Sequence, residues 1–525
     1  MVYPEVEQRL ARLINARQQG MLRGGLIGLE KEALRVASDG SLAQTPHPVE
    51  LGSALTHPWI TTDFSESQLE LITPPLPDIR AALDFMHDLQ LWTQRIMRDE
   101  FLWVTSMPCV VTGERGVPIA RYGSSNAGRM KHVYRVGLGH RYGRVMQAIA
   151  GVHFNYSCNE ALWPVFQVLE KDTRPLLEFI DKFYFGMIRN LQRMGWLIPY
   201  LFGSSPAVCK TFVGDQPTDM EWFDETTYYY PYATSLRMGD IGYQNNKAYE
   251  SGFKARYDNI DIYIASLSWA IDTPCERYGK IGVVVDGEYR QLNDHILQIE
   301  NEYYSTVRPK QILRGNEKPT IALRERGVRY VELRSLDLNP FDPLGMNESA
   351  MRFLEAFMLL CLLKESPRLG IKEVRQIDAN DLAAAHKGRD PGLRLRRNGR
   401  EMTVQSWGLE VLDAMAGICE VLDEGDPAAP YREALRQQRK ALLEPERTPS
   451  ARMLREMRDR GEGFHHYGRH LAEACRAHFA HRVLEESTQR EYVELAKTSR
   501  QRQSEIEAAD EQSFESYLEA YFAQA

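Results

Sequence analysis

The chain has 525 residues, of which 43% are hydrophobic, so a large enzyme core or several average domains with a sizeable buried interior are expected. Its 64 basic and 72 acidic residues give a formal charge of -8, which leaves no domain-wide positive field for a nucleic-acid backbone. Nucleic acid is therefore excluded as an expected partner.

The N-terminus is predicted to form an amphipathic helix, because Val6, Leu10, Leu13 and Ile14 fall on one helical face. It lacks the continuous apolar core of a secretion signal. The longest apolar run, 357–363, is far shorter than the roughly 20 residues that cross a bilayer, and it predicts a buried helix instead. The sequence thus predicts a cytoplasmic protein without a membrane partner.

Three segments, 24–36, 151–157 and 328–337, alternate like strands and place polar side chains together on one face. The opposite faces carry mainly apolar residues, together with Lys31 in 24–36. The polar residues on the three faces are Glu30 and Glu32; His153, Asn155 and Ser157; and Glu332 and Arg334.

Other segments give weaker predictions. Residues 281–292 predict a hairpin that turns at the dipeptide Asp286-Gly287. The Gly-, Ser-, Arg- and Tyr-rich segment 121–143 predicts an ordered loop that contacts ligand, with a plain surface loop as the alternative. For 298–310 two interpretations stay open, a pocket wall and an ordinary strand edge.

The texture of the chain changes near residue 345. Before that point, strand-like alternation is mixed with turns, whereas from Asn347 onward the chain is typical of successive helices. No internal repeat, low-complexity stretch or long linker separates the two parts. The prediction is an α+β catalytic core over 1–345, followed by a mostly helical region over 346–525 that packs on the core as one structural unit.

The seven cysteines are odd in number, lie far apart and include no CxxC pair. We therefore expect reduced thiols that pack in the core rather than a disulfide or a zinc site. They are Cys109, Cys158, Cys209, Cys275, Cys361, Cys419 and Cys475.

Charged residues recur where the strand pattern predicts burial, at the polar faces named above and at Glu70. Buried carboxylates are costly unless a cation compensates them. Carboxylate oxygens with one imidazole are hard ligands that suit magnesium or manganese, and magnesium in turn suggests phosphate chemistry. Each residue alone could be a solvated edge residue or an ion-pair partner, as Glu332 and Arg334 could be to each other. Their co-occurrence favours a metal site, which from spacing alone is a hypothesis.

Several known motifs are absent from the sequence. It contains no GxxxxGK[ST], no GxGxxG and no HExxH, so any nucleotide binds on another scaffold. His466 and His470 are four residues apart, as zinc ligands on a helix would be. They lie in a charge-rich segment, and a solvated surface helix is the preferred interpretation.

Taken together, the sequence resembles the glutamate–cysteine ligases of the gammaproteobacterial type. The resemblance covers most of the first 345 residues, and the helical remainder agrees mainly in length and texture. The blocks that carry it are GLEKEALRV, ELGSALTHPWITTDFSESQLELITP, YGSSNAGRMKHVYRVGL, MQAIAGVHFNYS, GWLIPYLFGSSPAVC, YATSLRMGDIGY, LQIENEYYSTVRPK and YVELRSLDLNPF. It implies a core related to glutamine synthetase, in which a curved antiparallel sheet forms a funnel-shaped active site surrounded by helices.

The resemblance also implies roles for individual residues. Arg334 is implied as a catalytic residue that contacts the transferring phosphoryl group or the glutamate carboxylate, His153 as a second catalytic residue, and Asn155 as a nucleotide contact. Arg237 is implied as the partner of the cysteine carboxylate, since a guanidinium can bind a carboxylate with two hydrogen bonds. The implied metal ligands are Glu30, Glu32, Asp63, Glu70, His153 and Glu332. The implied cysteine pocket is lined by Phe64, Tyr134, Leu138, Gln147, Ile149, Arg237, Tyr243 and Tyr304.

The activity implied is ligation of the γ-carboxylate of glutamate to the amine of cysteine through γ-glutamyl phosphate, as the first step of glutathione biosynthesis. ATP would be the co-substrate and Mg²⁺ or Mn²⁺ the metal. One alternative is a related ligase that takes another amine, and a second is a non-catalytic binding protein, whose expected loss of acids is not seen. A bifunctional enzyme that also adds glycine would need a further domain. The oligomeric state is not shown by the sequence, and a monomer is the working expectation.

Overall fold

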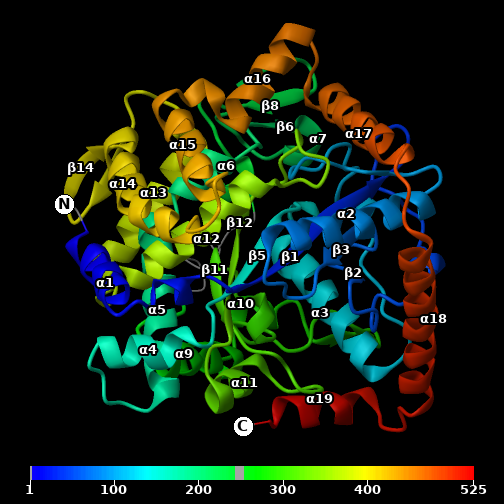
Figure 1. Cartoon of the computed structure of the whole chain (residues 1–525). Helices are drawn as coiled ribbons and strands as arrows, with labels where there is room; N and C mark the ends of the chain where they lie inside the picture. The colour runs from blue at the N-terminus through cyan, green and yellow to red at the C-terminus, as the bar shows by residue number, and fades with distance from the viewer. Residues whose placement is uncertain (1–2, 243–252, 525) are drawn as a thin grey trace.

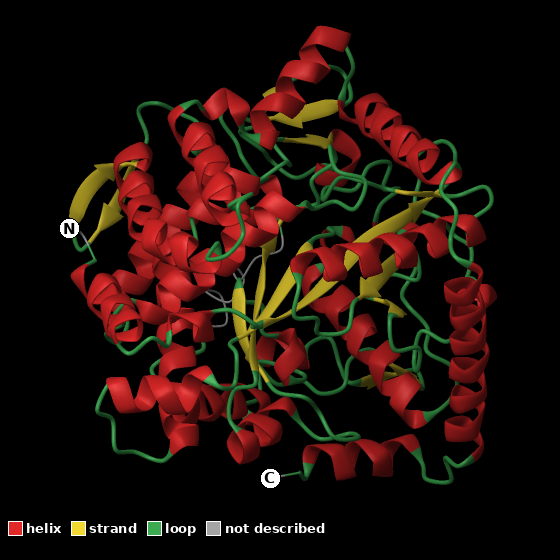
Figure 2. Ribbon diagram, viewed as in Figure 1, coloured by secondary structure: helices red, strands yellow, loops and turns green. Residues whose placement is uncertain are grey.

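A computed structural model of the chain describes residues 3–242 and 253–524. Its centre is an antiparallel sheet, and helices from both halves of the chain surround that sheet (Figures 1 and 2). This arrangement confirms the α+β class predicted from the sequence.

The central sheet has seven strands in the order β11-β12-β5-β1-β3-β2, and β4 pairs with the far end of β1. Every pair within it is antiparallel. The three strands predicted around the polar faces, β1, β5 and β12, are neighbours at its centre. The strands of the chain are β1 (Leu26–Val36), β2 (Ile60–Thr62), β3 (Gln68–Ile72), β4 (Phe101–Leu102), β5 (Val152–Ser157), β6 (Ala207–Cys209), β7 (Glu221–Trp222), β8 (Thr227–Tyr229), β9 (Val284–Val285), β10 (Glu288–Tyr289), β11 (Val307–Lys310), β12 (Tyr330–Leu336), β13 (Arg394–Arg397) and β14 (Arg400–Thr403).

Helices and loops make up the rest of the described chain, and most of the helices after residue 347 lie to the left and along the right-hand edge of Figure 1. They are α1 (Pro4–Asn15), α2 (Ile79–Ile96), α3 (Asn126–Tyr142), α4 (Leu162–Leu169), α5 (Leu176–Met194), α6 (Leu197–Phe202), α7 (Lys210–Val213), α9 (Ile260–Asp272), α10 (Glu276–Gly279), α11 (Pro319–Arg326), α12 (Glu348–Leu363), α13 (Ile371–Lys387), α14 (Val404–Leu422), α15 (Pro430–Leu443), α16 (Pro449–Arg460), α17 (Phe464–Ala480), α18 (Glu486–Ala508) and α19 (Phe514–Phe522). Short 3-10 turns include η4 (Met146–Ala148) and η5 (Leu236–Met238).

The apolar face of the sheet forms one side of the hydrophobic core. Leu29, Phe154 and Leu333 face in this direction and are buried, as period-two alternation predicts. Helices α2, α5, α6 and α12 pack against the sheet. The opposite face of the same strands therefore carries the polar residues.

Helix α12 is the centre of the helical region, because the apolar run 357–363 predicted as a buried helix lies within it and is fully buried. It contacts α1 and α5 from the first half of the chain and α14 and α15 from the second. The main hydrophobic cluster accordingly includes residues from both sides of residue 345. The division at that residue stays a prediction.

Residues 121–143 differ from the prediction, because most of them form helix α3 rather than a loop. Glycines are poor helix formers, which explains the wrong prediction. The hydroxyl of Ser125 caps the helix by accepting a hydrogen bond from the Gly128 N–H. At Gly137 a Cβ atom would collide with the Gln298 side chain, so tight packing requires glycine there.

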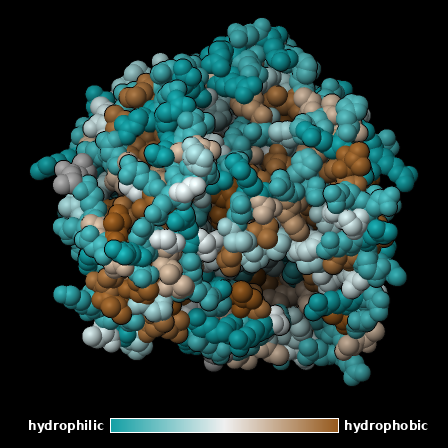
Figure 3. Space-filling view, in the orientation of Figure 1, coloured by the Kyte–Doolittle hydropathy of each residue, from teal (hydrophilic) through white to brown (hydrophobic). Residues whose placement is uncertain are grey.

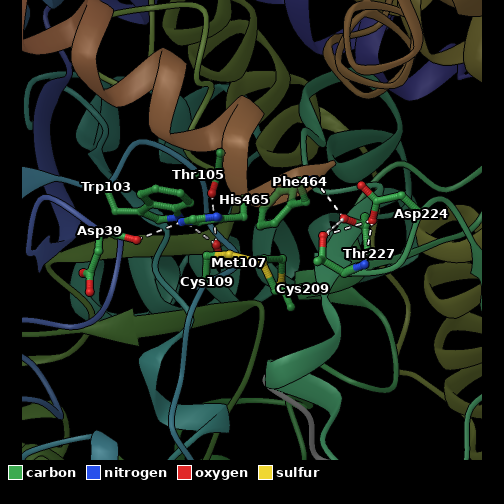
Figure 4. Close-up of a disulfide and its surroundings, with 11 residues drawn as sticks. Asp39, Trp103, Thr105, Met107, Cys109, Cys209, Asp224, Thr227, Phe464 and His465 are labelled. Atoms are coloured by element: carbon green, nitrogen blue, oxygen red, sulfur yellow. Dashed lines mark hydrogen bonds between the residues drawn. A yellow bond between two sulfur atoms is a disulfide. The ribbon is translucent and has the colours of Figure 1, made fainter. Parts of the chain in front are cut away.

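The prediction that every cysteine is a reduced thiol is wrong for Cys109 and Cys209, which form a disulfide (Figure 4). They are 100 residues apart in sequence, but their Cα atoms lie 5.5 Å apart, within the range that a disulfide bridges. The bond joins the segment after β4 to β6, beside the start of α17 at Phe464. The other five cysteines are free thiols, and four of them are buried.

Several smaller predictions are confirmed. Asp286 and Gly287 both have positive φ values, 53° and 82°, in the turn between β9 and β10. His466 and His470 are exposed on α17. No described helix is both long enough and apolar enough to cross a membrane. On the face seen in Figure 3, hydrophobic residues lie in separate groups among hydrophilic ones.

Candidate active site

The polar face of the central sheet brings together acids from three strands, β1, β3 and β12, with His153 and Asn155 from β5. In the antiparallel register, Glu30 lies opposite His153, and Glu32 lies opposite Glu70. In the next row Asn155 lies opposite Glu332. Residues opposite each other on neighbouring strands point to the same side, so these groups form one cluster. The sequence predicted the side on which the residues of β1, β5 and β12 point but assigned no side to Glu70, and the pairing of the strands brings them together.

His153 is the centre of this cluster and is almost completely buried. Its Nδ1 lies 3.0 Å from Glu30 Oε2, and its Nε2 lies 3.4 Å from Glu32 Oε1. Asn155 donates a hydrogen bond of 2.7 Å from its amide to Glu30 Oε1. Burial alone would raise the pKa of Glu30, but the hydrogen bond with His153 brings it below its ordinary value.

Glu332 lies among cations and is only 1% exposed. Lys310 Nζ and Arg334 NH1 each lie 3.2 Å from Glu332 Oε1. Burial would raise the pKa of Glu332, and the charges of Lys310 and then Arg334 hold it well below its ordinary value. Arg334 NH1 is also 3.4 Å from His153 Nδ1, so Arg334 links the two rows of the cluster. The register of β12 shifts between Leu333 and Leu336, and such irregularities are frequent next to active sites.

Glu32 and Glu70 keep raised pKa values although Arg237 and Arg334 attract Glu32, and Lys131 and Arg135 attract Glu70. Burial raises the pKa of Glu70 well above its ordinary value, and the charges of Glu30, Asp63 and Glu32 raise it further. The pKa of Glu32 is raised as well, by burial against the attraction of His153, with Asp63 adding to the rise. Directly opposed acids on two strands are unfavourable without a cation between them.

The residues of the cluster fit a divalent metal ion. One oxygen of Glu30, one nitrogen of His153 and one oxygen of Glu332 all lie within 4.8 Å of one another. Neither oxygen of Glu332 accepts a hydrogen bond from any described residue, although both are buried. The Oδ1 atom of Asn155 is buried and unsatisfied in the same way. Carboxylate oxygens that lie close together, and that hydrogen bonds within the protein do not all satisfy, are what a hard cation requires.

Arg237 lies at the edge of the cluster and is 3% exposed. Its NH2 group donates to the Arg334 carbonyl at 2.7 Å, and its NH1 group lies 3.8 Å from Asp337 Oδ1. A Cβ atom at residue 151 would collide with its guanidinium, so Gly151 makes room for it. The Gly151 N–H in turn donates to Glu32 Oε2 at 2.8 Å. Arg237 is therefore fixed beside the acids with part of its donor fork still available.

The other residues of the predicted cysteine pocket come from several elements. Tyr304 is close to Arg237, since its hydroxyl and the Arg237 NH1 both approach Met238 Sδ, at 4.0 and 3.4 Å. Their role as a pocket wall stays a prediction, and Tyr243 lies outside the described residues. The structure places Phe64 just after β2, Tyr134 and Leu138 on α3, Gln147 on η4 and Ile149 directly after it.

Sequence reasoning did not select four residues that the structure adds to the site. Lys310 belongs to a segment for which a pocket wall and a strand edge were both open. The structure confirms the strand edge, because β11 is an edge strand, and it places Lys310 in contact with Glu332. Gly151, Met238 and Asp337 gave no chemical signal in the sequence. Asp337 accepts hydrogen bonds from Ser204 and Ser235, so it acts as an anchor behind Arg237.

Comparison with known proteins gives the family. The model of the family described as glutamate–cysteine ligase matches residues 10–383, more than two thirds of the chain. The chain belongs to the glutamate–cysteine ligase family. The glutamate–cysteine ligase of Alcanivorax borkumensis is 46% identical over 523 residues, which cover 98% of this chain and 99% of that protein. The glutamate–cysteine ligase of Pseudomonas paraeruginosa is 43% identical over 518 residues, covering 99% and 98%.

Solved structures of similar proteins agree with this family. The crystal structure of the Francisella tularensis glutamate–cysteine ligase in complex with AMP has a TM-score of 0.88 and 35% identity, and the match covers 95% of this chain and 98% of that one. A bifunctional glutathione synthetase from Pasteurella multocida has a TM-score of 0.71 at 24% identity, covering 90% of this chain and 55% of that one. That second likeness concerns the fold alone.

Proposed function

We propose that the acidic face of the central sheet joins the γ-carboxylate of glutamate to the amine of cysteine at the expense of ATP. The products are γ-glutamylcysteine, ADP and phosphate, and the reaction is the first step of glutathione biosynthesis. The observation that carries the proposal is the set of buried and half-buried carboxylates around His153, in a chain of the glutamate–cysteine ligase family. The AMP complex of the Francisella relative supports adenine-nucleotide binding.

The metal in this proposal is Mg²⁺ or Mn²⁺, because the ligands are hard carboxylate oxygens with one imidazole. Glu30, His153 and Glu332 would hold one ion, since their ligand atoms lie within 4.8 Å of one another. Glu32, Glu70 and Asp63 would hold a second, because Glu32 lies opposite Glu70 and the charge of Asp63 acts on both. Bound divalent ions neutralise phosphate oxygens and so reduce the repulsion between ATP and the glutamate carboxylate. We also propose that the sheet curves into the glutamine-synthetase-like funnel implied by the resemblance.

Arg334 binds the phosphoryl group during the first step. In that step a γ-carboxylate oxygen attacks the γ-phosphorus of ATP, the bond to ADP breaks, and γ-glutamyl phosphate forms. Arg334 NH1 lies 3.2 Å from Glu332 Oε1 and 3.4 Å from His153 Nδ1. Its positive charge is therefore inside the cluster, where it can stabilise the negative charge that develops on the transferring phosphoryl group. Both ring nitrogens of His153 face carboxylates, and we assign His153 to orienting those acids. Asn155 is assigned as a contact of the bound nucleotide.

Arg237 binds the cysteine carboxylate during the second step, and the aromatic ring of Tyr304 lies on the same side. The cysteine amine then attacks the activated carbonyl carbon, phosphate leaves, and the amine loses a proton. Binding the cysteine carboxylate holds the amine in position for attack, which lowers the entropic cost of bringing the two reactants together. The buried hydrogen bond from Arg237 to the Arg334 carbonyl connects this pocket to the phosphoryl site.

The test measures phosphate and ADP release from ATP and Mg²⁺ with glutamate alone, with cysteine alone and with both. Release that requires both amino acids supports the proposal. A panel of other amines tests the alternative of a different acceptor, which a preferred amine other than cysteine would establish.

Variants then connect the activity to the acidic face. Glu30→Gln should abolish release, whereas Glu494→Gln, on the exposed surface of α18, should leave it unchanged. Full activity in Glu30→Gln would overturn the assignment of the site. Absence of any glutamate-dependent release in the unaltered protein would overturn the function.

A further inference from the structure

A buried lysine and a buried cysteine lie together on the apolar side of the central sheet. Lys31 lies between Glu30 and Glu32 on β1 but points to the opposite face, and it is 2% exposed. Cys475, on α17, is 7% exposed. No role in the proposed ligation uses either residue.

The two side chains converge on the same hydrogen-bond partners. The Pro343 carbonyl oxygen accepts from Lys31 Nζ at 3.5 Å and from Cys475 Sγ at 3.4 Å. Gln90, on α2, accepts from Lys31 Nζ at 2.6 Å through Oε1, and its amide lies 3.7 Å from Cys475 Sγ. The Lys31 amine and the Cys475 thiol are therefore held together by the same two residues, Pro343 and Gln90.

Lys31 also lacks a counter-ion. Within the part of the chain that the structure describes, the Lys31 Nζ atom bonds to two neutral oxygens, Gln90 Oε1 and the Pro343 carbonyl oxygen, and forms no ion pair with a carboxylate. A buried lysine is ordinarily paired with an acid, because an isolated charge is costly in the interior. This arrangement presents an amine next to a thiol, with no acid between them.

We propose that Lys31 and Cys475 form an oxidative modification site, at which a peroxide links the two side chains through a sulfur–nitrogen bond. In the first step the Cys475 thiol takes one oxygen from the peroxide and becomes a sulfenic acid, and hydrogen peroxide is reduced to water. In the second step the Lys31 nitrogen attacks Sγ, the S–O bond breaks, and hydroxide leaves with a proton from nitrogen as a second water. The thiol, the amine and one hydrogen peroxide thus give a sulfenamide and two waters.

The bond would tie α17 to the strand that carries two of the acids of the candidate site. Helix α2 packs on β1 and α17 packs on α2, so α2 already connects α17 to the strand. A thiol reductant attacks the sulfur of a sulfenamide and returns the free amine, which makes the modification reversible.

The experiment treats the folded chain with hydrogen peroxide, blocks free thiols, digests with trypsin and maps the peptides by mass spectrometry. Trypsin does not cleave after a lysine whose nitrogen is bonded to sulfur. We expect cleavage after Lys31 to be lost and peptide 24–35 to appear joined to peptide 470–476, which contains Cys475. The joined mass should be about 2 Da below the sum of the two peptides, and dithiothreitol should restore cleavage.

Three controls separate this site from general oxidation. The joined peptide should be absent in Cys475→Ser and in Lys31→Met, and also after peroxide treatment in urea, because only the fold brings the two residues together. The pair Cys361 and Lys364 is the internal control, since the two are neighbours on α12 but Lys364 Nζ bonds to the Glu365 carbonyl instead.

The outcome decides the proposal either way. Normal cleavage after Lys31 in the treated folded protein overturns it, whether Cys475 is unmodified or oxidised to a sulfinic acid. A joined peptide that also forms in urea overturns it as well. These readouts do not depend on ligase activity, so they are independent of the proposed function.

Discussion

Replacement of Glu70 by Gln should make the metal-free protein more stable while it destroys the activity. Glu70 lies directly opposite Glu32, and burial together with the charges of Glu30, Asp63 and Glu32 raises its pKa well above the ordinary value. In a protein whose acids only support the fold, removing one should lower stability. In a site built to hold cations, removing one relieves repulsion.

The magnitude follows from the register of β1 and β3. Opposite residues on antiparallel strands have Cβ atoms roughly 5 Å apart. At that separation two unit charges repel by about 3 kcal/mol in an effective dielectric of about 20. Because one carboxyl can take up a proton instead, the expected gain in the free energy of unfolding for Glu70→Gln is about 1 to 3 kcal/mol, or a few degrees in Tm.

The sign depends on pH in a defined way. The folded pKa of Glu70 is raised, so its contribution to stability is present below its unfolded pKa and is lost as the pH rises through the folded pKa. The stability difference between Glu70→Gln and the unaltered protein should therefore grow from pH 5 to pH 8. Glu494→Gln serves as the matched exposed control.

The assay is thermal unfolding in EDTA and in excess Mg²⁺ or Mn²⁺, with phosphate release measured in parallel. The unaltered protein should gain more from the metal than Glu70→Gln does, because bound ligand stabilises the folded state. If Glu70→Gln melts lower than the unaltered protein in EDTA and gains as much from the metal, the cluster is structural and our reasoning about the acids is wrong.

Three further predictions concern other parts of the chain. Burial raises the pKa of Glu355 to about 7, so the stability that Glu355 contributes is lost as the pH rises through that value. Between pH 4.5 and pH 8 the free energy of unfolding, measured by urea titration, should therefore fall by about 3 kcal/mol less in Glu355→Gln than in the unaltered protein. Reducing the bond between Cys109 and Cys209, which closes a loop of 100 residues, should lower the free energy of unfolding by about 4 kcal/mol. The control Cys275→Ser should leave thermal stability nearly unchanged. Equal melting temperatures with and without reductant would contradict this prediction. Arg237→Lys should raise KM for cysteine about 10- to 100-fold through loss of a two-point carboxylate contact while KM for ATP changes little, and an unchanged cysteine KM would remove Arg237 from the pocket.

The faces of the strands were predictable because alternation is a local property. Glu30, Asn155 and Glu332 each stand on the side that period two assigns to them, and the apolar residues between them are buried. The buried helix around 357–363 was predictable for the same reason, since the run is apolar on every side and too short to cross a bilayer.

Local patterns were insufficient where packing between distant segments decides the conformation. The glycines of 121–143 are typical of a loop, yet the segment forms α3, in which Gly137 packs closely against the side chain of Gln298. The partnership of Cys109 and Cys209 could not be predicted from their spacing, because it depends on how the segment after β4 lies against β6.

The sequence by itself determined which side chains share a strand face, and with the family blocks it determined the chemistry to expect there. Only the tertiary structure decided that His153 meets Glu30 from 123 residues away, that Lys310 completes the surroundings of Glu332, and that Lys31 and Cys475 meet on the opposite face. The reason is physical: side-chain direction follows from the backbone repeat of one strand, whereas contact between strands follows from register and packing, which involve the whole chain.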